Sequence, residues 1–115
     1  MQRPSLDDAL VHEEQVLRAF VLPDGSLRSI PTKVTKRLVI LNLIAQKFEI
    51  GRTYPEVEVN AALRTFHDDV AALRRYLVEE GFLERRDGQY WRAGGTVDSA
   101  AKPAGDPPVR PTVQP

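Results

Sequence analysis

The hydrophobic pattern of this chain changes at Gly81 from a helical period to a strand period, and this change constrains the fold most. From about residue 33 to this glycine, apolar residues recur every three or four positions, as on one face of an α-helix. Beyond it, strand-like runs at 82–86 and 89–92 flank Asp87-Gly88, a dipeptide that favours two-residue hairpin turns. The pattern therefore predicts helices followed by a β-hairpin.

Three helices are predicted before the hairpin, near residues 33–48, 54–65 and 68–80. The first has a broad apolar stripe that includes Leu41, so we expect it to be central and buried on most sides. Because its apolar side chains fill the middle of the domain, Leu41 is a predicted core residue.

The ends of the second and third helices carry capping signals. Thr53-Tyr54-Pro55-Glu56 matches a capping box, which predicts that the second helix opens there. The third helix is predicted to begin at Asp68 or Asp69, since a carboxylate suits a helix N-terminus. Gly81 is expected to end it.

The N-terminal part is predicted to add a helix and a second hairpin. Ser5 is placed to cap a short helix, with Asp8 three residues later. Strand-like runs at 19–22 and 27–30 flank Pro23-Asp24-Gly25-Ser26, which is strong turn chemistry. We therefore expect a short hairpin between the N-terminal helix and the first of the three main helices.

Three helices and a terminal hairpin, with a short link between the second and third helices, follow the order of a winged helix-turn-helix. We predict a mainly helical α+β, winged-helix-like domain over residues 16–92, preceded by an N-terminal extension over 1–15. The tail, 93–115, is rich in proline and has no aromatic residue, so it is predicted to be disordered.

Composition argues against several classes of function. The chain has no cysteine, which removes disulfides, thiolate nucleophiles and zinc–thiolate sites. No apolar run approaches the roughly 20 residues of a membrane span, and the N-terminus lacks the pattern of a signal peptide. These observations favour a cytoplasmic protein.

The residues with catalytic chemistry form no recognisable site. His67-Asp68-Asp69 has the residue types of a metal site, but neighbours at a helix start point in different directions and no further ligand completes a set. No Gly-x-Ser-x-Gly, glycine-rich phosphate loop or paired-carboxylate pattern is present. We therefore predict no metal, no cofactor and no enzymatic activity.

Charge leaves two binding functions open. The chain has 16 basic and 16 acidic side chains, but residues 16–92 hold 13 basic and 10 acidic ones, a net of +3. If the domain binds DNA, the candidate contacts are the cations that enter the first helix, lie on the third and decorate the hairpin: Arg28, Lys33, Lys36, Arg37, Arg74, Arg75, Arg85, Arg86 and Arg92.

The charges of the third helix argue against its contacting bases in the major groove, because its start is acidic and its net charge is −2. Its arginines are also placed to form ion pairs within the helix. DNA binding through the basic run and the hairpin, and docking of a protein partner in a regulatory complex, both remain open.

Asn60 lies in the middle of the second predicted helix, where the helix propensity of asparagine is poor. We favour a structural role for it over a contact with a partner.

Short motifs over residues 16–92 also have the spacing of a known bacterial family. They are Asp24-Gly25, Leu27, Ile30-Pro31, Lys36-Arg37-Leu38, Phe48, Tyr54-Pro55-Glu56, Val59-Asn60, Phe66-His67-Asp68-Asp69, Leu73-Arg74-Arg75 and Tyr90-Trp91-Arg92. On these motifs the stretch resembles the family known as domain of unknown function 2087. Members often stand beside bacterial transcription regulators, so the resemblance implies a winged-helix-like fold and a regulatory setting, but no activity.

Overall fold

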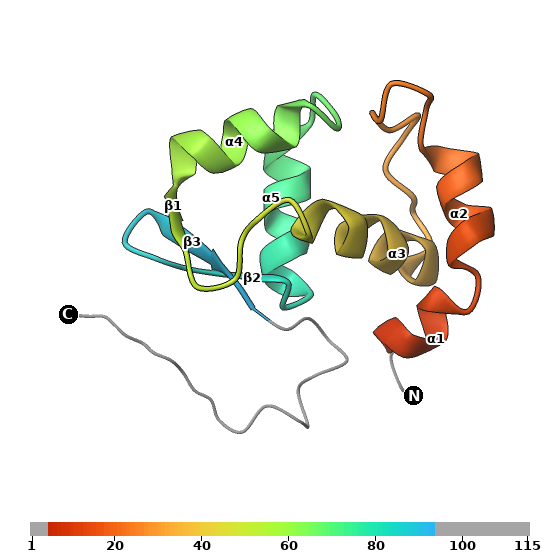
Figure 1. The fold of residues 1–115 in the computed structure, drawn as a ribbon, viewed down its shortest axis with the longest axis horizontal. Helices are drawn as coiled ribbons and strands as arrows, with labels where there is room; N and C mark the ends of the chain where they lie inside the picture. Colours follow the sequence, from red (N-terminus) through yellow and green to blue (C-terminus); the bar gives the residue numbers. More distant parts are fainter. Residues whose placement is uncertain (1–4, 94–115) are drawn as a thin grey trace.

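A computed structural model describes residues 5–93 of the chain (Figure 1). The described part is α+β and mainly helical, as predicted. Its elements, in chain order, are α1 (Leu6–Leu10), α2 (Glu13–Phe20), α3 (Val34–Ala45), β1 (Thr53–Pro55), α4 (Glu56–Arg64), α5 (Val70–Glu79), β2 (Leu83–Arg86) and β3 (Gln89–Arg92). The predicted disorder of the tail concerns residues that lie almost entirely outside the described part.

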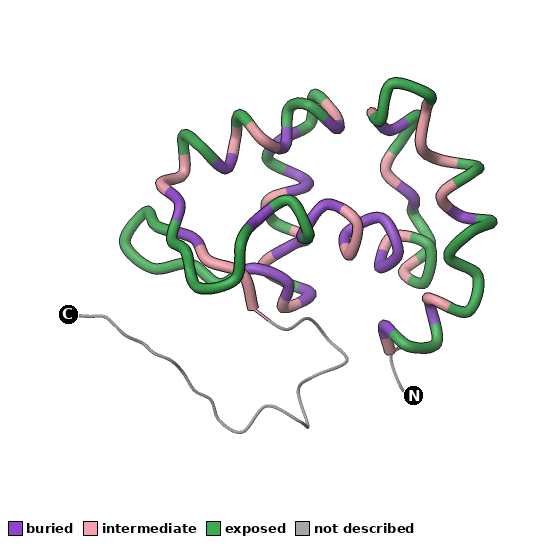
Figure 2. The backbone as a smooth tube through the Cα atoms, in the orientation of Figure 1, coloured by how far each residue is buried: buried purple, intermediate pink, exposed green. Residues whose placement is uncertain are grey.

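Helix α3 forms the centre of the molecule. It packs against α1 and α2 on one side and α5 on another, and its residues 38–41 are all buried (Figure 2). The helix ends three residues before the predicted Phe48, because the amides of Lys47 and Phe48 donate to carbonyls only three residues back, in a tighter turn. Phe48 is nevertheless buried, as its place in the apolar stripe predicts.

The N-terminal part contains two helices and not the predicted helix and hairpin. The Ser5 hydroxyl caps α1 by accepting the amide N–H of Asp8 at 3.1 Å, as expected. Helix α2 then continues through Phe20, so the first predicted strand is wrong, and the flanks of the turn meet only in a single bridge between Val21 and Leu27. Around this bridge the Leu22 amide donates to the Ser26 carbonyl and the Arg28 amide to the Phe20 carbonyl, while the Leu27 amide points outward and donates to the Phe66 carbonyl near the α4–α5 turn. The ladder does not extend further because Phe20 and the residues before it belong to α2.

The predicted capping box at the start of the second main helix is also wrong. Thr53 to Pro55 form strand β1, and α4 begins only at Glu56, with no side-chain cap. Antiparallel pairing with β3 places Thr53 opposite Trp91, so the extended backbone satisfies its hydrogen bonds in the sheet. The Glu56 carboxylate accepts a hydrogen bond from the Tyr90 hydroxyl at 2.8 Å.

The C-terminal hairpin has the predicted register. Strands β2 and β3 pair so that Arg86 lies opposite Gln89, which leaves Asp87 and Gly88 as the turn. Both turn residues have positive φ, 54° and 79°, as a two-residue hairpin of this kind requires. In the sheet order β1-β3-β2, the inner face presents the buried Leu83 and Tyr90 to the helices.

Candidate nucleic-acid interface

The nine cations predicted to contact DNA do not form one surface. Lys33, Lys36 and Arg37 surround the start of α3, and Arg28 precedes them in the loop. The other five lie on α5 and the hairpin: Arg74, Arg75, Arg85, Arg86 and Arg92. Figure 1 shows the hairpin and the first turn of α3 at opposite ends of the molecule. Arg37 and Arg75, in contrast, both lie against the ring of Tyr76 on α5. A flat contact area therefore includes the hairpin cations or those at the start of α3, but not both.

Arg37 is engaged within the fold. Its Nη1 donates to the carbonyls of Pro31 at 3.2 Å and Thr32 at 3.0 Å. Its guanidinium also lies 4.3 Å from the ring centroid of Tyr76, in a cation–π contact with α5. The half-buried Arg37 thus ties the loop before α3 to α5, which leaves the exposed Lys33 and Lys36 as the outward cations of this run.

Three further arginines of the predicted set bond to other parts of the chain. Arg74 donates to the side-chain oxygen of Asn60 at 2.6 Å, which confirms the structural role expected for that asparagine. Arg92 donates to the Phe48 carbonyl at 3.4 Å, and Arg28 donates to the Ala19 carbonyl at 3.3 Å. Arg92 is only partly exposed.

Arg75 is the exposed arginine of α5. Its Nε lies 3.9 Å from a carboxylate oxygen of Glu79, one turn on, and its guanidinium is 5.0 Å from the Tyr76 ring centroid. The predicted ion pair within the helix is confirmed for Arg75, whereas Arg74, for which one was also predicted, bonds to Asn60 of α4. Because both partners are about half exposed, this pair contributes little to stability and can exchange for another anion.

The hairpin presents Arg85 and Arg86 in adjacent positions of β2. The Arg86 side chain is 83% exposed, and its Nε lies 4.0 Å from a carboxylate oxygen of the exposed Asp87. Arg85 donates to the Tyr90 hydroxyl at 3.4 Å, and this hydrogen bond raises the pKa of the guanidinium above its ordinary value. Tyr90 donates in turn to Glu56, so the hairpin is joined to the first turn of α4.

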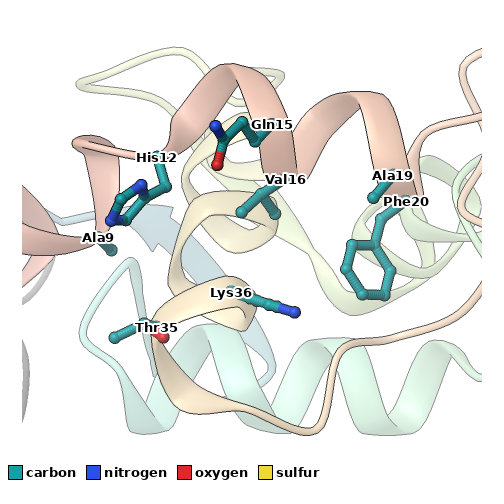
Figure 3. Close-up of a pocket in the computed structure, with 8 residues that line it drawn as sticks. All are labelled: Ala9, His12, Gln15, Val16, Ala19, Phe20, Thr35 and Lys36. Atoms are coloured by element: carbon teal, nitrogen blue, oxygen red, sulfur yellow. The ribbon is translucent and has the colours of Figure 1, made fainter.

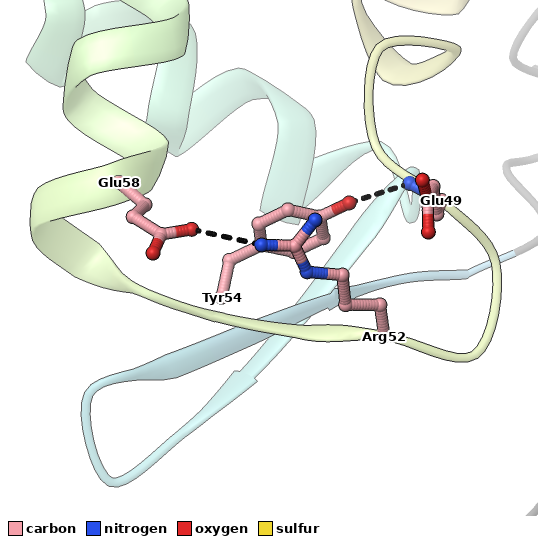
Figure 4. Close-up of polar contacts among 4 residues, drawn as sticks. All are labelled: Glu49, Arg52, Tyr54 and Glu58. Carbon is pink, nitrogen blue, oxygen red and sulfur yellow. Dashed lines mark hydrogen bonds and ion pairs between the residues drawn. The ribbon is translucent and has the colours of Figure 1, made fainter.

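Arg52 is a cation that sequence reasoning did not single out (Figure 4). Its guanidinium lies 4.5 Å from the ring centroid of Tyr54 and pairs with Glu58 at 3.4 Å. The Tyr54 hydroxyl accepts the amide N–H of Glu49 at 2.7 Å, which fixes the ring beneath Arg52. An arginine two residues before a tyrosine is too common a pattern to predict this stack.

A groove of about 210 Å³ lies between α2 and the start of α3 (Figure 3). Ala9, Val16 and Phe20 give it an apolar lining, and Lys36 lies with its ammonium 6.0 Å from the Phe20 ring centroid. This volume is below the range typical of small-molecule sites, and the lysine at its edge is exposed. The groove is therefore not included with the cationic surfaces as a candidate binding site.

The His67-Asp68-Asp69 motif serves the start of α5. Nδ1 of His67 accepts the amide N–H of Asp69 at 3.0 Å, and the Asp69 carboxylate accepts the amide N–H of Ala72 at 3.1 Å. Within residues 5–93, no group of three or more His, Cys, Asp or Glu side chains is placed to hold a metal ion. The motif is thus accounted for by local hydrogen bonds.

Asp69→Ala is expected to lower the free energy of unfolding by about 1 kcal/mol, because it removes the side-chain cap of α5. Asp68→Ala is the matched control, since it removes a neighbouring carboxylate that makes no cap bond. Urea denaturation of both variants measures the difference. Equal losses would show that charge near the helix end, and not the cap, is what stabilises α5.

The geometry defines a small α+β domain in which a helix pair and a hairpin lie beside a central helix. A family model described as an uncharacterized protein conserved in bacteria, domain of unknown function 2087, matches residues 26–92. The chain belongs to this family. The matched range begins ten residues later than the resemblance predicted from the motifs, so it leaves out α1 and α2. No curated protein and no solved structure matches the chain.

Within residues 5–93, the helices are too short or too polar to cross a membrane.

Proposed function

We propose that this chain is a non-catalytic winged-helix DNA-binding domain that acts in bacterial transcription regulation. The observation that carries the proposal is the exposed arginine pair, Arg85 and Arg86, on a hairpin that follows a helix–turn–helix pair. The order α3, β1, α4, α5, β2, β3 and the sheet order β1-β3-β2 support a winged helix, with the hairpin as the wing.

The charges around α5 favour contacts to the DNA backbone over readout of bases. Asp68 and Asp69 are exposed at the start of this helix, where they would repel phosphates. Arg85 and Arg86 are exposed on β2 of the hairpin, which lies at one end of the molecule (Figure 1). Lysines and arginines that neutralise phosphates bind duplexes of any sequence and release counterions as they do so.

Docking of a protein partner is the second candidate function, and exposed apolar side chains support it. Ile50 is 77% exposed in the loop before β1, and Val57 is 73% exposed in the first turn of α4. Several predicted DNA-contacting arginines also bond within the fold, which reduces the cationic surface. A partner with an apolar patch would cover these two side chains, and no nucleic acid would be required.

A salt titration of binding to random-sequence duplex DNA separates the two functions. If the domain binds the DNA backbone, log K should fall linearly with log[salt], with a slope of about −0.9 for each phosphate contact. Fluorescence anisotropy of a labelled duplex measures the affinity at each salt concentration. Absence of binding at low salt would overturn the DNA-binding proposal and leave the protein-docking function.

A further inference from the structure

Asn60 and Arg74 join the two helices of the helix–turn–helix pair at their middles. Asn60 is the fifth residue of α4, and Arg74 is the fifth residue of α5. An Arg74 nitrogen lies 2.6 Å from the Asn60 side-chain oxygen, and both residues are partly buried. This contact crosses the turn between the helices and connects residues 14 positions apart.

Apolar packing alone does not fix how these helices are turned against each other. Val59 and Leu63 of α4 and Leu73 and Leu77 of α5 are all buried, but burial of apolar surface is non-directional. A hydrogen bond from a charged guanidinium is directional and stronger than one between neutral groups. The Asn60–Arg74 bond therefore selects one orientation among those that the apolar contact allows.

The bond also explains an asparagine in a position where helix propensity is poor. An asparagine in the middle of a helix competes with the backbone for hydrogen bonds and destabilises it relative to alanine. Here the side-chain oxygen of Asn60 is engaged by Arg74, across the helix pair. Arg75, the neighbour of Arg74 in α5, is in contrast exposed.

We infer that Asn60 and Arg74 form a clamp that fixes the orientation of α5 relative to α4. Arg74 is then a positioning residue and not a ligand of DNA phosphate. The clamp itself follows from the geometry, and the exclusion of Arg74 from the DNA contacts rests on the proposed function. Removing either side chain should therefore disturb the orientation of α5 in the same way, although only Arg74 carries a charge.

The clamp is tested first by a double-mutant cycle in the absence of DNA. Asn60→Ala and Arg74→Ala are each expected to raise the unfolding equilibrium constant about tenfold in urea denaturation, and the double variant by about the same factor. Asn60→Asp keeps an acceptor for Arg74 and should be close to the wild type. Independent effects, with about a hundredfold increase in the double variant, would overturn the clamp.

The positioning role is tested by salt titrations of the same variants on random-sequence duplex DNA. Asn60→Ala and Arg74→Ala should lose affinity by the same factor at every salt concentration, with the wild-type slope. If Arg74→Ala alone flattens the slope, by about 0.9, Arg74 binds a phosphate and the inference is wrong. If the wild type does not bind the duplex at all, the proposed function fails, while the cycle without DNA still decides whether the clamp exists.

Discussion

Leu41→Ala is expected to lower the free energy of unfolding by about 2–5 kcal/mol. Leu41 is fully buried in α3, the helix that packs against α1 and α2 on one side and α5 on another. Truncation to alanine loses the transfer free energy of the removed carbons. It also leaves a cavity, because the elements on both sides of α3 can move only partly into the empty space. The loss is large against the total stability of a domain of this size.

Urea denaturation followed by circular dichroism measures this change, and Ile50→Ala is the control. Ile50 is 77% exposed, so its truncation should change stability by less than about 0.5 kcal/mol. A loss below about 1 kcal/mol for Leu41→Ala would mean that the middle of α3 is not the core of the domain.

Replacing Arg85 and Arg86 together with alanine is expected to weaken binding to all DNA sequences alike. Each lost phosphate contact should flatten the slope of log K against log[salt] by about 0.9, so the double variant should lose up to roughly two units. Both side chains are exposed, but Arg85 also bonds to Tyr90. Each single variant should therefore be measured beside the double one.

Arg18→Ala is the control for loss of charge elsewhere on the surface. Arg18 is an exposed cation of α2 paired with Glu14, and α2 lies at the end of the molecule opposite the hairpin (Figure 1). Its removal should leave the salt slope unchanged. Thermal denaturation of the hairpin variant checks that the fold survives the loss of the Arg85–Tyr90 hydrogen bond. A folded hairpin variant with the wild-type slope would show that the wing does not touch phosphate.

Arg75→Ala tests the rival geometry, in which α5 enters the major groove and reads bases. If this change relaxes sequence preference while the hairpin variant binds normally, α5 and not the wing is the principal contact. The exposed Asp68 and Asp69 would then have to point away from the groove. If neither change affects DNA but both abolish binding to a protein partner, the docking function replaces the DNA-binding one.

Local sequence determined the features whose hydrogen bonds close within a few residues. Asp87-Gly88 set the turn and register of the C-terminal hairpin, because a two-residue turn with two positive φ values restricts which residues occupy it. Ser5 and Asp69 cap their helices through amides three residues ahead. The central position of α3 was also readable, since apolar residues cover most of its surface.

Tertiary structure decided the features whose partners lie far along the chain. Thr53-Tyr54-Pro55-Glu56 carries a local signal for a helix start, but β3 pairs with this segment from more than 30 residues away and holds it as a strand. The predicted N-terminal hairpin is reduced to one bridge because α2, which packs on α3, continues through Phe20 and takes up the residues of the first predicted strand. In both places packing against distant elements decided the conformation over the local signal in the sequence.

The residues of the candidate site show the same difference between what local sequence and what tertiary structure determined. Sequence identified the cations but not their availability, because Arg37, Arg74 and Arg92 look like surface residues in the sequence. Arg74 finds its acceptor 14 residues away and Arg92 finds one 44 residues away. A guanidinium has five donors and a long side chain, so it bonds to whatever acceptor the fold brings within reach, and only the packing of the elements determines which acceptor that is.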